Sequence, residues 1–199
     1  MIFIKTLFNG LKLYRFGNRE GQTVLYFPGY NTNLYACPYH IPNECNVYVI
    51  FPADGKDKNR SSGFEPYYRH GFEILKKINI NTEETILVGF SNGGIMLSSY
   101  IFLQKFKAII INSPVWYLPE SFNVSTKEAI DNYNLLNQGK VIVTINKKEK
   151  IERQTRNIFD KYKPEYLVNE YGHSPKVLMI AMTKLLKDIN KENNTFSLF

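Results

Sequence analysis

Short apolar runs, bounded by turn-forming residues, alternate along this chain with segments whose apolar residues recur at helical spacing. The pattern predicts strands at residues 2–7, 12–16, 24–27, 46–51, 85–88, 108–112, 140–145 and 165–169, and helices at 65–78, 92–105, 151–162 and 174–189. Near-continuous apolar strands that alternate with helices are typical of a buried parallel sheet. We therefore expect an α/β fold with a mostly parallel central sheet and helices on both of its faces.

Three stretches depart from this alternation. The first two predicted strands are separated by Asn9-Gly10, which favours an antiparallel hairpin. Residues 53–63 are rich in charge, glycine and serine and are predicted to form an exposed loop. The tail at 191–199 is expected to be frayed.

The composition favours one globular domain spanning residues 1–199. The chain has 199 residues, of which 44% are hydrophobic, enough for one substantial core. Its formal net charge is +7, but the positive residues are scattered and form no basic arm, so a nucleic-acid partner is not favoured. The two cysteines have neither metal-site nor redox spacing, and no metal is expected.

The amino terminus does not resemble a targeting segment. Residues 1–13 mix apolar residues with lysines and have no continuous apolar stretch or small-residue cleavage site. No segment of the sequence has the apolar length needed to cross a bilayer. We expect a cytoplasmic protein.

The most informative motif is Gly89-Phe90-Ser91-Asn92-Gly93, which directly follows the apolar run at 85–88 and precedes a predicted helix. This is the pattern of a nucleophile elbow, a sharp strand-to-helix turn that exposes a serine hydroxyl. The strand and helix come so close there that the residues two before and two after the serine must be small. The alternative is a glycine-rich turn with an incidental serine.

A general base for Ser91 is expected after another strand, because sites in open α/β sheets gather at the carboxyl ends of the strands. His173 follows the last predicted strand and is the only histidine downstream of Ser91. It is the candidate that accepts the serine proton and returns it to the leaving group. The alternative role for His173 is capping of the final helix. His40 and His70 are expected to be structural.

A carboxylate should hold the imidazole in one tautomer. Glu149 comes four residues after the predicted strand at 140–145 and is the candidate, with Glu152 as its neighbouring rival. Asp131 and Asp160 fall in helical contexts and rank lower. A solvated charge among lysines is the alternative interpretation of Glu149.

The oxyanion of an acyl-transfer reaction needs two backbone N–H donors. The residue after the nucleophile, Asn92, would supply one. Pro28-Gly29 ends an earlier strand, and the amide of Tyr30 is the candidate for the second donor. An ordinary turn is the alternative at Pro28-Gly29.

With these motifs, in the order serine, acid, histidine, the chain resembles the α/β-hydrolase superfamily from about residue 24 to 186. The resemblance implies an acyl-enzyme mechanism without a metal or organic cofactor. The chain departs from the superfamily where many members have His-Gly, because it has Pro28-Gly29. It also departs in the acid loop, which lacks the usual aspartate.

In similar hydrolases, the region corresponding to 113–139 forms a lid, and here it is rich in proline and aromatic residues. Its second part is predicted to form a helix through Ile130, Tyr133 and Leu136. Trp116, Tyr117 and Leu118 are the candidate substrate-binding residues, which would favour a small hydrophobic ester or thioester as substrate. A connector packed on the core remains an equal alternative for this region.

The leading hypothesis is therefore a serine hydrolase that acts on a small-molecule acyl substrate. Peptidase or acyltransferase activity would use the same triad. A catalytically inactive hydrolase-like domain that binds a partner is the main alternative from another class. The charge of +7 also permits a weaker alternative, a binder of anions or lipid surfaces.

Overall fold

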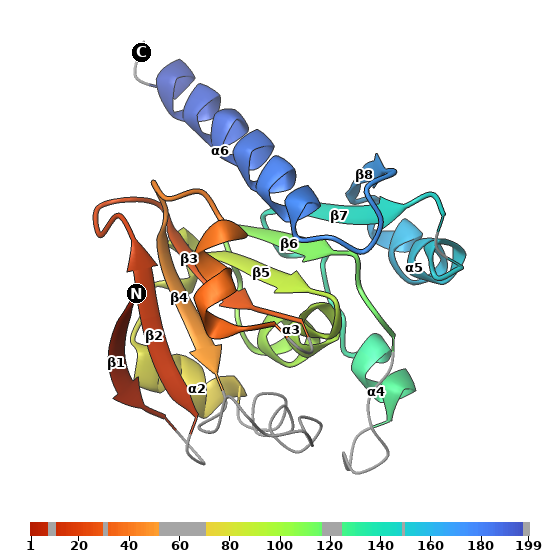
Figure 1. Ribbon diagram of the computed structural model, residues 1–199. Coiled ribbons are helices and arrows are strands. Elements are labelled where there is room, and N and C mark those ends of the chain that lie inside the picture. The colour runs from red at the N-terminus through yellow and green to blue at the C-terminus, as the bar shows by residue number, and fades with distance from the viewer. Residues whose placement is uncertain (8–10, 30–31, 52–70, 117–124, 149, 197–199) are drawn as a thin grey trace.

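The computed structural model describes residues 1–7, 11–29, 32–51, 71–116, 125–148 and 150–196 (Figure 1). The strands are β1 (Ile2–Thr6), β2 (Lys12–Gly17), β3 (Thr23–Phe27), β4 (Asn46–Phe51), β5 (Ile86–Phe90), β6 (Ala108–Asn112), β7 (Lys140–Asn146) and β8 (Glu165–Asn169). The α-helices are α2 (Gly71–Ile78), α3 (Asn92–Leu103), α4 (Thr126–Asp131), α5 (Glu152–Phe159) and α6 (Lys176–Phe196). Short 3₁₀ helices are η2 (Leu34–Tyr39), η3 (Thr82–Glu84) and η4 (Asp160–Tyr162).

Within the described residues, eight strands form one sheet in the order β1-β2-β4-β3-β5-β6-β7-β8. The pairs β1–β2 and β2–β4 are antiparallel, and every other neighbouring pair is parallel. The predicted mostly parallel sheet with an antiparallel opening hairpin is therefore confirmed. Because the central strands are parallel, their carboxyl ends lie at one edge, and the loops that follow β3, β5, β6, β7 and β8 meet there.

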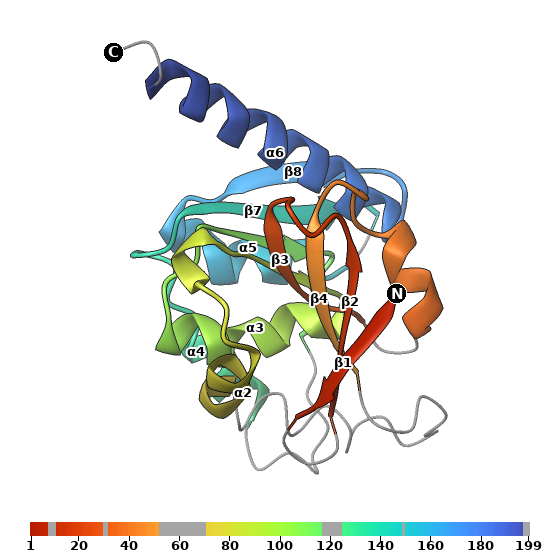
Figure 2. The ribbon, with the colours of Figure 1, turned by 90° about the vertical axis from the view of Figure 1, so that its left-hand side faces the viewer.

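Helices cover both faces of the sheet, as the alternating pattern predicts (Figures 1 and 2). One buried cluster joins Ile74 of α2, Ile95 of α3 and Phe159 of α5 to one face. The second cluster joins Leu178 and Met182 of α6 to the other face, together with the segment around η2. The two clusters are the two halves of a core that is divided by the sheet.

Helix α3 is apolar on nearly all sides because it is buried on nearly all sides. Its residues Ile95, Met96, Leu97 and Tyr100 are almost inaccessible to solvent, and the helix packs against β5, β3, α2 and α4. This central position fixes the start of α3 relative to the ends of β3 and β5.

The element boundaries differ from expectation in two places. The final helix continues to Phe196, whereas fraying was expected from residue 191. The stretch 190–196 contains neither glycine nor proline, so nothing in it stops a helix that α6 has already nucleated. Between 113 and 139, the helix predicted to continue through Leu136 is short and ends at Asp131, with Leu136 exposed. The predicted loop at 53–63 lies outside the described residues.

In the part of the chain that the structure describes, no helix combines the length and the apolar character that a bilayer span requires.

An ion-pair network fastens α6 to the end of the sheet. Lys140 of β7 bonds to Asp188 of α6 and lies 3.4 Å from Glu165 of β8, and Lys184 of α6 bonds to the same Glu165. Hydrogen bonding to Lys184, and then to Lys140, lowers the pKa of Glu165. Lys140 lowers the pKa of Asp188 in the same way. The network therefore favours the ionised carboxylates in the folded protein.

A pH dependence of stability follows from these lowered pKa values. A carboxyl group whose pKa is lowered by folding stabilises the protein above the pKa of the unfolded chain, about 4, and loses this contribution as the pH falls through the folded value. We expect Glu165→Gln to lower the free energy of unfolding by about 1 kcal/mol or less at pH 7, because the pairs are partly exposed. Urea unfolding at several pH values measures the difference, which should shrink below about pH 4.

Glu83→Gln is the matched control, since Glu83 is an exposed residue of η3 outside this network. A Glu165→Gln effect that stayed constant from pH 7 to pH 3 would contradict a role for the ionised carboxylate.

Candidate active site

Ser91 lies in the turn between β5 and α3 with a strained backbone. Its φ is 56° and its ψ is −124°, a conformation that residues with a Cβ rarely adopt and that costs on the order of 1–3 kcal/mol. The flanking glycines show why the turn is so sharp. A Cβ at Gly89 would lie 2.6 Å from the carbonyl oxygen of Gly93, and one at Gly93 would lie 2.1 Å from that of Phe27. The turn has the geometry that the motif predicts for a nucleophile elbow.

Backbone hydrogen bonds hold this strained turn in place. The N–H of Ser91 donates to the carbonyl of Asn112 at 2.9 Å. The carbonyl of Ser91 accepts from the N–H of Gly94 at 2.9 Å and from that of Val115 at 3.3 Å. Both backbone groups of the serine are thus satisfied by neighbouring segments, so the conformation is fixed by its surroundings.

The loop after β6 contributes to the same support. Ser113 is the residue after that strand and also has a positive φ, 43°. Its N–H donates to the carbonyl and the hydroxyl of Thr144 at 3.2 and 3.1 Å. This second sharp turn directs the chain back toward the elbow, where Val115 reaches the carbonyl of Ser91. In the sequence, Ser113-Pro114 indicates only the end of the strand at 108–112, so this role of Ser113 has no local signature.

Asn92, one of the two residues proposed for the oxyanion hole, directly follows Ser91, and Gly29, which precedes the other, lies close to Ser91. Asn92 is the first residue of α3, and N–H groups in the first turn of a helix have no acceptor within the helix. Gly29 lies at the end of β3 so close to the nucleophile that a Cβ there would be 2.7 Å from the Cβ of Ser91. The segment that ends at Gly29 therefore passes directly beside Ser91. Tyr30, the candidate for the second donor, lies outside the described residues.

His173 lies in the loop between β8 and α6, and its ring reaches the elbow. The imidazole stacks on the ring of Phe90, with the ring centroids 5.1 Å apart and the planes inclined by 29°. Phe90 directly precedes Ser91 in the chain. The structure therefore brings the predicted nucleophile and the predicted base to the same edge of the sheet.

The predicted acid, Glu149, lies outside the described residues, but the residues before it are close to the His173 loop. The side-chain oxygen of Asn146 accepts the N–H of Lys148 at 3.1 Å. A Cβ at Gly172 would lie 3.9 Å from the side-chain nitrogen of Asn146. The loop after β7 thus begins beside the residue that precedes His173.

The rival carboxylates have other partners. Glu152 accepts a hydrogen bond from Arg156 at 3.3 Å within α5. Asp131 pairs with Lys127 of the same helix, at 2.6 Å. Asp160 accepts from the hydroxyl of Tyr166, at 2.8 Å. These contacts favour local structural roles for all three.

His40 is buried and contacts other aromatic residues. Its Nδ1 lies 2.8 Å from the hydroxyl of Tyr26, and burial lowers the pKa of the imidazole. These contacts are those of a structural histidine, as expected. His70 lies outside the described residues.

Trp116 packs into the core. It is 8% exposed, its indole N–H donates to the hydroxyl of Thr155 at 3.0 Å, and its ring packs on Phe159 and Tyr133 at centroid distances of 5.3 and 6.0 Å. These contacts favour a packed connector for this residue, the alternative that the sequence left open. Tyr117 and Leu118 lie outside the described residues, and a substrate contact by any of the three stays a prediction.

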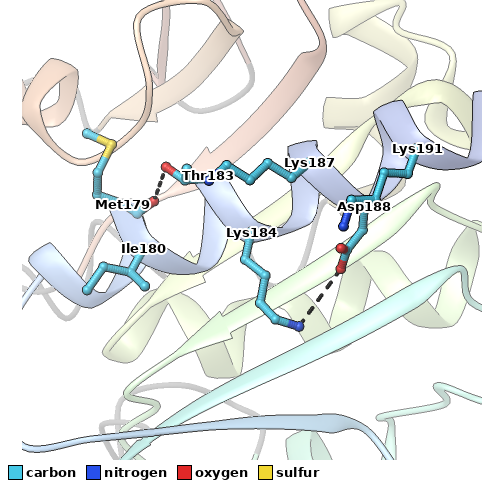
Figure 3. A pocket seen from close by; sticks show the side chains of 7 residues that line it. All are labelled: Met179, Ile180, Thr183, Lys184, Lys187, Asp188 and Lys191. Carbon is cyan, nitrogen blue, oxygen red and sulfur yellow. Dashed lines mark hydrogen bonds and ion pairs between the residues drawn. The ribbon is translucent and has the colours of Figure 1, made fainter. Parts of the chain in front are cut away.

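A surface groove of about 480 Å³ runs along α6 (Figure 3). Residues of one side of that helix line it, namely Met179, Ile180, Thr183, Lys184, Lys187, Asp188 and Lys191. None of them belongs to the elbow or to the His173 loop. Among the described residues, no three His, Cys, Asp or Glu side chains are grouped so that they would hold a metal ion.

Comparison with known proteins identifies the fold. No protein-family model and no curated protein sequence matches the chain. Among solved structures, it is similar to a provisionally assigned carboxylesterase from Lactobacillus plantarum WCFS1, with a TM-score of 0.61 and 15% sequence identity over 96% of this chain and 98% of that one. An α/β-hydrolase from Vibrio vulnificus has a TM-score of 0.61 and 11% identity over 91% and 76% of the two chains. A sugar hydrolase from Lactococcus lactis has a TM-score of 0.59 and 13% identity over 96% and 98%.

These likenesses, together with the strand order and the elbow, show that the chain has the α/β-hydrolase fold.

The close packing at the elbow leads to a stability prediction. We expect Gly93→Ala to lower the free energy of unfolding by about 3 kcal/mol or more, because the new methyl group would meet backbone atoms of Phe27 that cannot move aside. Urea denaturation measures the loss. Gly71→Ala is the control, since the nearest atom to its Cβ is the Ser99 hydroxyl at 3.3 Å, the end of a side chain that can rotate. Equal stability of the Gly93→Ala variant and the wild type would contradict the elbow geometry.

Proposed function

We propose that the protein is a serine hydrolase that cleaves a small hydrophobic ester or thioester through an acyl-enzyme intermediate. The observation that carries the proposal is the pairing of a strained, glycine-flanked serine at a strand-to-helix turn with a histidine ring stacked on the adjacent residue. The fold supports it as well, because the solved structures that resemble this chain include proteins named as an esterase and as hydrolases.

In the proposed reaction, His173 removes the proton of the Ser91 hydroxyl as the serine oxygen attacks the acyl carbon. The tetrahedral intermediate collapses, the bond to the alcohol or thiol breaks, and His173 returns the proton to the leaving group. Water then attacks the acyl-serine with His173 again as the base, which releases the carboxylic acid and restores the serine. The reaction needs only these side chains and water.

The negative charge of the tetrahedral intermediate would be stabilised by the backbone N–H groups of Asn92 and Tyr30. Asn92 begins α3, so the partial positive charge at the amino end of that helix favours an anion there. The contact between Gly29 and Ser91 supports a donor from the next residue, Tyr30. Both donors are main-chain groups, which would explain why the site tolerates Pro28-Gly29 in place of His-Gly.

Glu149 is the proposed partner of His173. The carboxylate would accept the other imidazole N–H, select the tautomer that accepts the serine proton, and stabilise the imidazolium that forms. The proximity of Asn146 to Gly172 supports this assignment, as does the engagement of Glu152 by Arg156. For the acyl pocket, Trp116, Tyr117 and Leu118 remain the proposed lining residues.

The nucleophile is tested by turnover of short aryl esters and acyl thioesters. We expect Ser91→Ala and His173→Asn each to lower kcat/KM by at least about 1,000-fold, because each removes a member of the triad. Ser99→Ala is the control: Ser99 lies on the same helix and donates its hydroxyl to the carbonyl of Met96. Turnover by Ser91→Ala equal to that of the wild type would refute the proposal. A wild type that is inactive on every ester, thioester and peptide, but binds a partner without Ser91 and His173, would support the inactive binding domain.

The acid is tested by a matched pair of glutamates. We expect Glu149→Gln to lower kcat by about 100-fold or more, because the amide neither fixes the tautomer nor stabilises the imidazolium. Glu152→Gln should change kcat by less than about 3-fold, since the carboxylate of Glu152 accepts a hydrogen bond from Arg156 instead. Steady-state kinetics on one substrate decides between them. The reverse order of effects would assign the acid to Glu152.

A further inference from the structure

A row of packed rings connects the interior of the sheet to His173. Tyr26 of β3 bonds to His40, whose ring meets that of Phe90 edge to face, with centroids 6.3 Å apart and planes inclined by 71°. Phe90 in turn stacks on His173. Phe90 is only 7% exposed, so its ring is held between the two histidines.

We propose that Phe90 is a positioning residue that fixes the plane of the His173 imidazole for proton transfer with Ser91. The proposal rests on the proposed function, in which His173 is the base. Phe90 is the second residue of the Gly-x-Ser-x-Gly motif, a position for which the motif specifies no particular side chain.

The physical argument concerns the side-chain torsions of histidine. The torsion of the imidazole about its Cβ–Cγ bond is broad and roughly two-fold, so a histidine in an exposed loop samples many ring planes. Proton transfer needs one nitrogen within hydrogen-bond distance of the hydroxyl. Offset stacking on the buried ring of Phe90 favours one plane and leaves only the two orientations related by a flip. A carboxylate partner then selects between them, so Phe90 and the acid would perform separate tasks.

Phe90 can serve as a fixed platform because its own position is supported. His40 ends η2, where its backbone N–H donates to the carbonyl of Cys37 at 3.0 Å. Burial lowers the pKa of His40 and raises that of Tyr26, so this pair remains uncharged near neutral pH and its packing does not change there. The ring packing also joins the segment after β3, the elbow after β5 and the loop after β8.

The test compares two buried phenylalanines. We expect Phe90→Leu to lower kcat by about 10- to 100-fold with KM changed less than about 3-fold, because the base is misplaced while substrate binding is kept. Phe90→Tyr, which keeps the aromatic face, should restore kcat to within about 5-fold of the wild type. Phe106→Leu is the control for stability alone, since Phe106 is also buried and precedes β6 at the opposite edge of the sheet.

A wild-type kcat in Phe90→Leu would overturn the proposal, and so would an equal loss of kcat in Phe106→Leu at equal thermal stability.

A second readout does not depend on activity. Ring protons of His173, assigned by comparison with the His173→Asn spectrum, should resonate upfield in the wild type because they lie against the face of Phe90. The upfield shift should vanish in Phe90→Leu and persist in Phe106→Leu. Unshifted protons in the wild type would refute the stacking and with it the positioning role. Full turnover by Ser91→Ala would instead refute the proposed function, so the two failures are distinguishable.

Discussion

Helix α3 begins so close to the ends of β3 and β5 that no side chain fits at Gly89 or Gly93. The approach is forced by burial, because α3 is apolar on nearly every side and is packed beneath the centre of the sheet. The chain must therefore turn from β5 into α3 at a single residue, Ser91. Ser91 adopts a positive φ to do so, and its N–H and carbonyl are satisfied by neighbouring segments. The strain is thus balanced by the packing of the core, and the serine is held at the edge of the sheet where the loops meet.

The other parts of the site depend on parallel strand order. Since β3, β5, β6, β7 and β8 all end at this edge, residues far apart in the sequence become neighbours there. Ring packing connects His40, Phe90 and His173, and the side chain of Asn146, at the start of the loop after β7, lies near Gly172. The ion pairs of α6 contribute indirectly, because they fasten the helix that directly follows the His173 loop.

The sequence predicted the features that have local signatures. Apolar runs indicate strands, and the glycines around Ser91 report a close approach that the structure confirms. His173 could be selected because it is the only histidine after Ser91 and follows a strand.

The extension of α6 to Phe196 was missed because a polar helix end shows no apolar periodicity. Phe90 and His40 were missed as partners because ring packing between distant segments has no signature in sequence spacing. Trp116 lies in a segment whose proline and aromatic residues are typical of a substrate pocket. In the structure its ring packs on Phe159 and its indole N–H donates to the hydroxyl of Thr155. The catalytic roles of Ser91, His173 and Glu149 stay predictions. So do the oxyanion-hole roles of Asn92 and Tyr30 and the substrate contacts of Trp116, Tyr117 and Leu118.

The central claim is that the hydroxyl of Ser91 is an activated nucleophile. Covalent modification tests it most directly, independently of the natural substrate. The protein is treated with a fluorophosphonate, digested, and mapped by mass spectrometry. The account predicts one phosphonyl group on the peptide that contains Ser91, with modification slowed strongly in His173→Asn. Modification of a different serine, or a folded wild type that remains unmodified, would contradict it.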